Sequence, residues 1–288
     1  LDLGAGASRY GLFTTIKGRV LSDVTAIVDE SAILLRLPPG QADAVREHMA
    51  KYVITDRVEL AVSHDVLPIV IAGPLAQERL DAWSGGRSLD VAPGTHLSLP
   101  ILGAPTRVLR EERLGVPAFS LWFDAAAAEK TVTAMLEAGD PPTPVGLGAV
   151  ETVRVESGIP RFGVDFGDDT FPQEAGLDEA VSYEKGCYLG QEIVARIHFR
   201  GGVNRTLRGL RLDAEVAPGI AVVADGREAG RVTSVARSDG GKALALAMLA
   251  VSVAVGERVE LDSGVSVAGV TAGVVTAEVV ELFAASGR

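Results

Sequence analysis

The chain has 288 residues, of which 47% are hydrophobic and 23% are charged. These proportions are typical of a globular protein and exclude a disordered chain. The net charge of −11 repels phosphate backbones, which argues against non-specific nucleic-acid binding. The most apolar run, residues 243–255, falls short of the ~20 residues that a bilayer-spanning helix requires, so we expect no membrane span.

Cysteine and histidine usage limits the kinds of site that the chain can hold. The single cysteine, Cys187, excludes an intramolecular disulfide framework and a cysteine-cluster metal site. The four histidines are scattered and have no metal-ligand spacing, so we expect no metal site. The chain begins at Leu1 rather than Met and has no visible secretory feature, which favours a cytoplasmic protein with an incomplete N-terminus.

The first two thirds of the chain predict two α+β segments, residues 1–88 and 89–200. In the first segment the patterns predict strands over 12–16, 19–28, 32–37, 58–62 and 69–72, a helix over 41–52 and a helix that begins near Pro74. In the second segment they predict strands over 96–102, 107–110 and 118–123, a helix over 125–138 that is capped by Asp124, and a helix over 145–157.

A third segment, residues 201–288, has a different pattern. Helical spacing ends after Gly201-Gly202, and short strands rich in Val and Ala alternate with turn signals such as Asp225-Gly226. This pattern predicts a small C-terminal β-barrel. The expected fold class is therefore α+β, with two α+β segments followed by an all-β barrel.

One local basic run stands out in this acidic chain. Residues 196–211 contain five arginines and His198 but no acidic residue. The five are Arg196, Arg200, Arg205, Arg208 and Arg211. We expect them to form a basic patch that binds an anionic group.

The first motif is Lys-Gly-Cys-Tyr-Leu-Gly-Gln-Glu at residues 185–192. Gly186 and Gly190 allow close approach of the backbone to a ligand, and Lys185 lies two residues before Cys187, where its charge favours the thiolate. The alternative is that Cys187 is a small buried hydrophobic residue. The residues alone leave these two interpretations open.

The second motif is Arg-Val-Glu-Ser-Gly-Ile-Pro-Arg-Phe-Gly at residues 154–163. A helix ends here, and a carboxylate at such an end can accept two parallel N–H donors of the kind that a pterin or guanine edge offers. Glu156 is that carboxylate. The alternative is an ordinary salt bridge between Glu156 and Arg154 or Arg161.

Both motifs carry a resemblance to a known family. Residues 185–192, followed by Ala-Arg-Ile-His-Phe-Arg-Gly at 195–201, are similar to the signature of the YgfZ family of folate-binding proteins, relatives of the glycine-cleavage T-protein. The second motif resembles the segment that both families place at the pterin, and residues 11–25 resemble the early hairpin of the same superfamily. This family usually has about 40 further residues ahead of the point where this chain begins, so we expect part of the first segment to be missing.

The resemblance implies a three-part ring around a central folate site, with tetrahydrofolate as the cofactor. Glu156 matches the carboxylate that holds the pterin, Arg205 matches a folate-contacting arginine, and Cys187 matches the reactive cysteine of the family. We also place Lys185 and Arg196 among the folate-binding residues. Asp23 lies near the position of the T-protein's catalytic aspartate, but Ser22 replaces the acidic residue beside it.

The function that the resemblance implies is that of a tetrahydrofolate-binding accessory factor. Its partners are folate and iron–sulfur client enzymes, including tRNA-modifying ones. Two alternatives stay open. One is a folate-dependent aminomethyltransferase with Asp23 as its general acid, and the other is a regulator of tRNA modification that binds RNA through the arginines.

Overall fold

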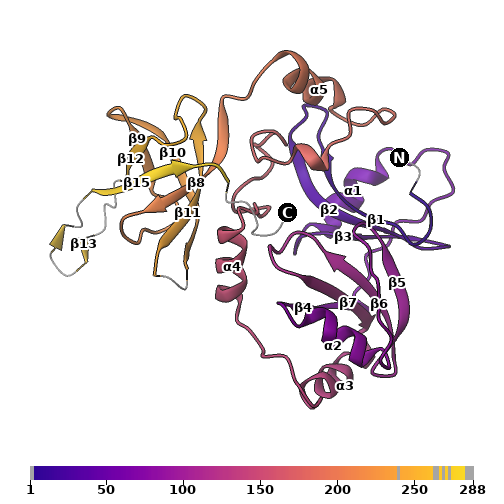
Figure 1. Cartoon of the computed structure of the whole chain (residues 1–288). Coiled ribbons are helices and arrows are strands. Elements are labelled where there is room, and N and C mark those ends of the chain that lie inside the picture. Colours follow the sequence, from indigo (N-terminus) through magenta and orange to yellow (C-terminus); the bar gives the residue numbers. More distant parts are fainter. Residues whose placement is uncertain (1–2, 239–240, 262–265, 268–269, 272–273, 283–288) are drawn as a thin grey trace. The chain divides into compact units, whose positions relative to one another are not determined.

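The computed structural model describes residues 3–238, 241–261, 266–267, 270–271 and 274–282 (Figure 1). The chain divides into two compact units. The N-terminal unit comprises Leu1–Phe13 and Ser22–Val145, and the C-terminal unit comprises Thr14–Leu21 and Gly146–Arg288. The tip of an early hairpin therefore belongs to the C-terminal unit.

The N-terminal unit contains two antiparallel sheets and three helices. A three-stranded sheet has the order β1 (Ser8–Thr14), β2 (Val20–Val28), β3 (Ile33–Arg36). A four-stranded sheet has the order β4 (Val66–Ala72), β7 (Ala118–Asp124), β6 (Ala104–Glu111), β5 (His96–Ile101). The helices are α1 (Ala42–Ala50), α2 (Ala76–Trp83) and α3 (Ala125–Leu136).

The pairing of β4 with β7 corrects the expected boundary at residue 88. The two strands pair along their whole length, from Val66 with Asp124 to Ala72 with Ala118. Leu80 and Phe123 lie in one buried cluster, although they come from opposite sides of residue 88. The N-terminal unit therefore takes in residues from both expected segments and ends at Val145, and residues 146–200 of the second expected segment belong to the C-terminal unit.

Two local predictions in this unit have different outcomes. The side chain of Asp124 caps α3 as predicted, since its Oδ1 accepts a 2.8 Å hydrogen bond from the backbone N–H of Ala126. The strand expected over 58–62 is absent, and Val58 is 56% exposed. The alternating residues Val58, Leu60 and Val62 could form an apolar strand face, but no described strand pairs with this segment and none of the three is fully buried.

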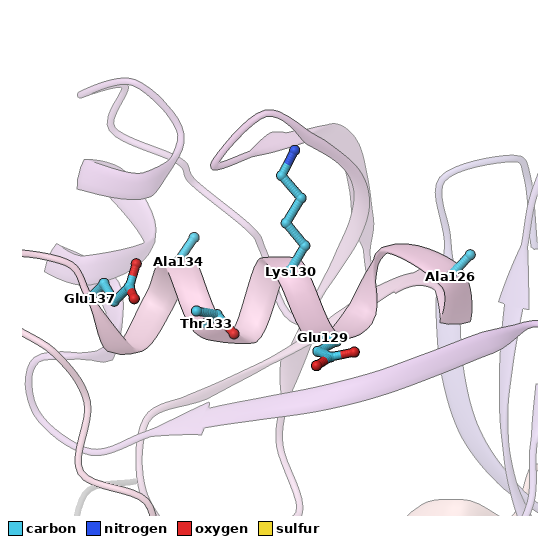
Figure 2. Close-up of a pocket in the computed structure, with 6 residues that line it drawn as sticks. All are labelled: Ala126, Glu129, Lys130, Thr133, Ala134 and Glu137. Carbon is cyan, nitrogen blue, oxygen red and sulfur yellow. The ribbon is translucent and has the colours of Figure 1, made fainter.

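The surface of α3 carries a shallow depression (Figure 2). Its volume is about 470 Å³, and its lining residues come from this helix and its C-cap. They are Ala126, Glu129, Lys130, Thr133, Ala134 and Glu137. None of them is a predicted site residue, so we assign no function to this depression.

The C-terminal unit consists of helices and a closed barrel. The helices are α4 (Leu147–Glu156), the short 3-10 helix η1 (Asp178–Ala180) and α5 (Gln191–Arg200). The barrel strands, in chain order, are β8 (Arg205–Leu212), β9 (Ala221–Ala224), β10 (Arg227–Arg237), β11 (Ala243–Ala250), β12 (Arg258–Leu261) and β15 (Val275–Val280). A separate two-stranded sheet joins β13 (Ser266–Val267) and β14 (Val270–Thr271).

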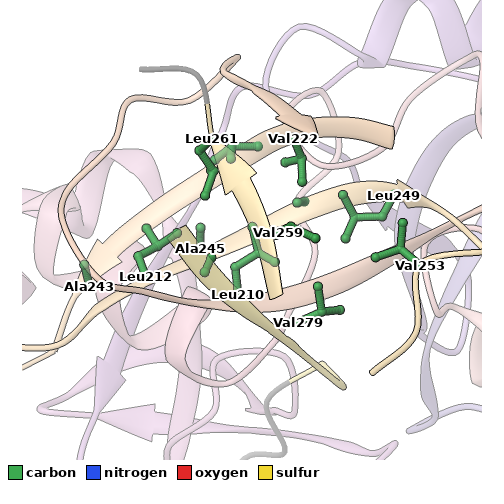
Figure 3. Close-up of a cluster of buried hydrophobic side chains, with 13 residues drawn as sticks. Leu210, Leu212, Val222, Ala243, Ala245, Leu249, Val253, Val259, Leu261 and Val279 are labelled. Carbon is green, nitrogen blue, oxygen red and sulfur yellow. The ribbon is translucent and has the colours of Figure 1, made fainter. Parts of the chain in front are cut away.

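The barrel closes around a core of aliphatic side chains (Figure 3). Leu210, Val222 and Leu261 are completely buried in it. Asp225 and Gly226, with φ values of 49° and 71°, form the predicted turn between β9 and β10. The expected fold class, α+β segments followed by a C-terminal barrel, is therefore confirmed.

Helix α5 lies where no helix was predicted from the sequence. The helical spacing is present in Ile193, Val194 and Ile197, but it covers only a few residues directly after a glycine-rich motif. The longest described helix, α3, has 12 residues. Within the described part of the chain, no helix combines the length and the apolar character needed to cross a bilayer.

Candidate functional site

The end of α4 places Glu156 in a well-defined backbone geometry. Gly158 has a φ of 65°, and its N–H donates to the carbonyl of Val155 at 3.0 Å. The N–H of Ile159 donates to the carbonyl of Arg154, also at 3.0 Å. These two bonds form a Schellman motif, in which a glycine in the left-handed region ends the helix. The last helical residue, Glu156, is thereby fixed in place.

The salt bridge considered for Glu156 is not formed. The Arg154 guanidinium is buried and contacts the carboxylates of Asp165 at 2.6 Å and Glu151 at 2.8 Å. Arg161 also pairs with Glu151. Among the described residues, the half-buried carboxylate of Glu156 has no hydrogen-bond or ion-pair partner. It lies at a helix C-terminus, where the helix dipole disfavours negative charge. Because it has no described partner, its oxygens are free to accept hydrogen bonds.

Arg205 on β8 binds two carboxylates of its own unit. Its Nε donates to Glu174 at 3.2 Å, and its Nη2 donates to Asp169 at 3.0 Å. Burial alone would lower the pKa of Arg205, but its hydrogen bonds to these two carboxylates and their negative charges outweigh burial and raise the pKa. Within the described part of the chain its Nη1 keeps donors without a partner, so a ligand contact through that group stays a prediction.

The five arginines do not form the expected patch. Arg208 pairs with Glu281 at 2.7 Å and Arg211 pairs with Glu278 at 3.6 Å. Arg196 and Arg200 lie on α5 and have no carboxylate within 4 Å in the part of the chain that the structure describes. The acids come from β15 and the residue after it, which are distant in sequence, so the run itself does not reveal them.

Cys187 is exposed, which overturns the alternative of a buried packing residue. Lys185 is also exposed, and its Nζ lies 5.0 Å from the centroid of the Tyr188 ring. The thiol and the ammonium group thus both belong to the loop that precedes α5. An exposed thiol is available for alkylation, oxidation or transient bonding.

Gly190 has a different role from the predicted approach to a ligand. Its φ is 76°, and an added Cβ would lie 2.4 Å from the carbonyl oxygen of Thr15 and 2.6 Å from the nitrogen of Gly18. The Thr14 hydroxyl donates to the carbonyl of Leu189 at 2.5 Å. The hairpin tip therefore packs directly on the end of the cysteine motif, and only glycine fits there. Gly186, in contrast, has nothing within 4 Å of an added Cβ.

Asp23 lies in the N-terminal unit, on β2. Its Oδ2 accepts a 3.0 Å hydrogen bond from the Tyr10 hydroxyl, and the Arg113 guanidinium lies 4.1 Å from the Tyr10 ring centroid. Burial raises the pKa of the Asp23 carboxyl above its usual value, against the opposing effects of the Tyr10 hydrogen bond and the Arg113 charge. Ser22 is buried, and its hydroxyl donates to the backbone carbonyl of Asp23 at 2.9 Å.

The raised pKa predicts that Asp23 makes stability depend on pH. A carboxyl with a folded-state pKa above its unfolded value favours folding fully below the unfolded pKa, and that contribution is lost as the pH rises through the folded-state pKa. We expect Asp23→Asn to gain stability relative to the wild type as the pH rises above about 4, the ordinary aspartate pKa, in a comparison that runs from acidic to neutral pH. Denaturant titrations across this range measure the difference, with exposed Asp56→Asn as the control. A difference that does not change with pH contradicts the prediction.

The structure distributes the predicted site residues over both units. Glu156, Lys185, Cys187, Arg196 and Arg205 belong to the C-terminal unit, and Asp23 belongs to the N-terminal unit. Several polar residues near the candidates lie in neither of the two sequence motifs. These are Arg19, Asp165, Asp169, Glu174, Thr233 and Ser234. No local spacing could have found the Asp165 cluster, because its hydroxyl donors lie 68 and 69 residues away.

Comparison with known proteins identifies a family whose two domains match consecutive parts of this chain. The chain matches the GCVT N-terminal domain over residues 1–185 and the glycine cleavage T-protein C-terminal barrel domain over residues 205–281. The chain belongs to the glycine cleavage T-protein family. Membership of the T-protein superfamily is thus confirmed, whereas the YgfZ branch stays a prediction.

Several relatives show the extent of the similarity. An aminomethyltransferase of Herpetosiphon aurantiacus is 31% identical over 89% of this chain and 72% of its own length. A chloroplastic Arabidopsis thaliana protein with a provisional transferase name is 28% identical over 77% of this chain, and the match spans 52% of that protein, about half of its length. The crystal structure of the glycine cleavage system aminomethyltransferase T from Bartonella henselae superposes with a TM-score of 0.83 at 21% identity, over 98% of this chain and 77% of that one. At this identity, the superposition establishes the fold alone.

Proposed function

We propose that this protein binds tetrahydrofolate and serves as an accessory factor for iron–sulfur enzymes, including tRNA-modifying ones. The observation that carries the proposal is the free carboxylate of Glu156. Both neighbouring arginines bind other acids, so the position has a half-buried acceptor without a described partner. A pterin edge supplies the paired N–H donors that such a carboxylate binds.

The exposed cysteine supports the accessory role. Cys187 is the only thiol of the chain and lies on an open loop. One cysteine cannot hold an iron–sulfur cluster, so any cluster contact needs ligands from a client protein. The thiol can supply one thiolate ligand to such a cluster, so its contact with a client is expected to be transient.

A folate-dependent aminomethyltransferase is the second candidate. The name of the Herpetosiphon aurantiacus relative favours it, and so does the raised pKa of Asp23, which suits a general acid. Ser22 weakens it, because its hydroxyl is bound to the backbone carbonyl of Asp23 where the T-protein has a second acid. RNA binding has less support still, since Arg205, Arg208 and Arg211 are paired with carboxylates.

Two substitutions distinguish the two main candidates. In a bacterial strain that lacks its own YgfZ-type gene, we expect the wild type and Asp23→Asn to restore iron–sulfur enzyme activity and Cys187→Ser to leave it near background. Cys187→Ser is expected to fold normally, because the side chain is exposed and the volume change is small. Circular dichroism and tetrahydrofolate titration of both variants provide the control.

The opposite pattern supports the transferase. Purified protein would then convert an aminomethyl-dihydrolipoyl carrier protein and tetrahydrofolate to methylenetetrahydrofolate, ammonia and the dihydrolipoyl carrier protein. Asp23→Asn would abolish this turnover and Cys187→Ser would retain it. Full complementation by Cys187→Ser contradicts the accessory role.

A further inference from the structure

A buried carboxylate lies next to the Glu156 segment and receives four hydrogen bonds. The Asp165 side chain is completely buried. Its Oδ2 accepts from Arg154 Nη1 at 2.6 Å and from the Arg161 backbone N–H at 2.9 Å. Its Oδ1 accepts from the hydroxyls of Thr233 at 2.5 Å and Ser234 at 2.7 Å. Every part of this cluster lies in the C-terminal unit.

An irregularity in the barrel brings both hydroxyls to this carboxylate. The register of β10 against β11 shifts between Val232, which faces Ala247, and Ser234, which faces Leu246. Thr233 is therefore the extra residue of a β-bulge. In a regular strand, consecutive side chains point to opposite faces, whereas here both reach the same oxygen of Asp165. The bulge directs barrel side chains toward the segment that follows α4.

Arg154 extends the cluster to both sides of Glu156. Its Nη2 donates to Ser234 Oγ at 2.6 Å, and its Nη1 donates to the carbonyl of Ile159 at 2.7 Å. Its own carbonyl accepts from the N–H of Ile159. The last turn of α4 and the loop after it are thus tied to each other and to β10, with Glu156 between them.

We propose that Asp165, Thr233 and Ser234 are positioning residues for the Glu156 carboxylate, so that the barrel sets the geometry of ligand binding. This inference rests on the proposed role of Glu156 in binding tetrahydrofolate. This role requires no contact between the cluster and the ligand. It acts by holding Arg154 and the helix end in a single conformation, which places the carboxylate for two simultaneous N–H donors.

A double-mutant cycle with Glu156→Gln tests the proposal on the full-length protein. The measured quantity is the tetrahydrofolate dissociation constant of Ser234→Ala, of Thr233→Val, of Glu156→Gln and of each double variant. We expect Ser234→Ala to weaken binding about 3- to 10-fold in the wild-type background and less than about 1.5-fold in the Glu156→Gln background. Thr233→Val provides a second, independent arm in case Ser234→Ala folds poorly.

A matched control lies on the same barrel. Asp213 there accepts hydrogen bonds from Thr276 and Arg258 in an exposed cluster of the same chemical kind. We expect Thr276→Val to leave tetrahydrofolate affinity unchanged, which separates positioning from a general effect of losing a barrel hydroxyl. Thermal melts of all variants check that each is folded at the titration temperature.

The outcomes distinguish the positioning role of the hydroxyls from the folate-binding role of Glu156. If Glu156→Gln weakens binding but neither hydroxyl variant does, the positioning role is overturned and the proposed function stands. If the hydroxyl variants weaken binding equally in both backgrounds, their effect does not pass through Glu156, and the positioning role is again overturned. If Glu156→Gln leaves binding unchanged, the folate assignment of Glu156 fails, and this inference fails with it.

Discussion

Tetrahydrofolate binding is expected to weaken by about 10- to 150-fold when Glu156 is replaced by alanine, which corresponds to a loss of about 1.5–3 kcal/mol. The physical reason is that one carboxylate accepts two N–H donors of the pterin, and its removal leaves both donors without a partner in the bound state. Arg154 and Arg161 cannot take over this role, because they are hydrogen-bond donors that already bind other acids. Anaerobic isothermal titration calorimetry measures the change directly.

The same variant is expected to fold as well as the wild type. Glu156 has no described partner whose loss would cost stability, and removing a negative charge from a helix C-terminus is neutral or slightly favourable. The matched control is Glu137→Ala, which removes an exposed glutamate from the C-cap of α3. Unchanged tetrahydrofolate affinity in Glu156→Ala, or an equal loss in Glu137→Ala, contradicts the assignment.

A large effect on folding is expected for Gly190→Ala. A residue other than glycine at a φ of 76° costs about 1–2 kcal/mol from the left-handed conformation alone. The added methyl group would also lie 2.4 Å from the carbonyl oxygen of Thr15, a backbone atom that cannot rotate away. We therefore expect the free energy of unfolding to fall by more than about 3 kcal/mol, as measured by guanidinium denaturation.

Gly186→Ala is the matched comparison within the same motif. Gly186 is exposed, and an added Cβ meets no atom within 4 Å. Its substitution should change the free energy of unfolding by less than about 0.5 kcal/mol. Equal destabilisation by the two substitutions would show that the hairpin tip does not pack on Gly190 as described. A large loss of tetrahydrofolate binding in a fully folded Gly186→Ala would instead return that glycine to the predicted role of ligand approach.

Elements that depend on local physics were predictable from the sequence. The helix over 125–138 was predicted because its periodicity and its Asp124 cap lie within one short stretch. The turn at Asp225-Gly226 was predicted because those residue types adopt positive φ values readily. The boundary at residue 88 was wrong for the converse reason. The pairing of β4 with β7 joins segments about 50 residues apart, and no local pattern reports such pairing.

The candidate site also has features that the sequence indicated and features that only the folded structure shows. The sequence by itself singled out both motifs and their members Glu156 and Cys187, because glycines gather there beside charged and reactive side chains over a few positions. Only the tertiary structure decided what those members contact. Arg154 could have paired with Glu156, two residues away, but it binds Asp165 and Ser234, which lie 11 and 80 residues from it. Side-chain pairing depends on distance in space and on burial rather than on sequence separation, so the free carboxylate of Glu156 and the packing role of Gly190 emerge only after the chain has folded.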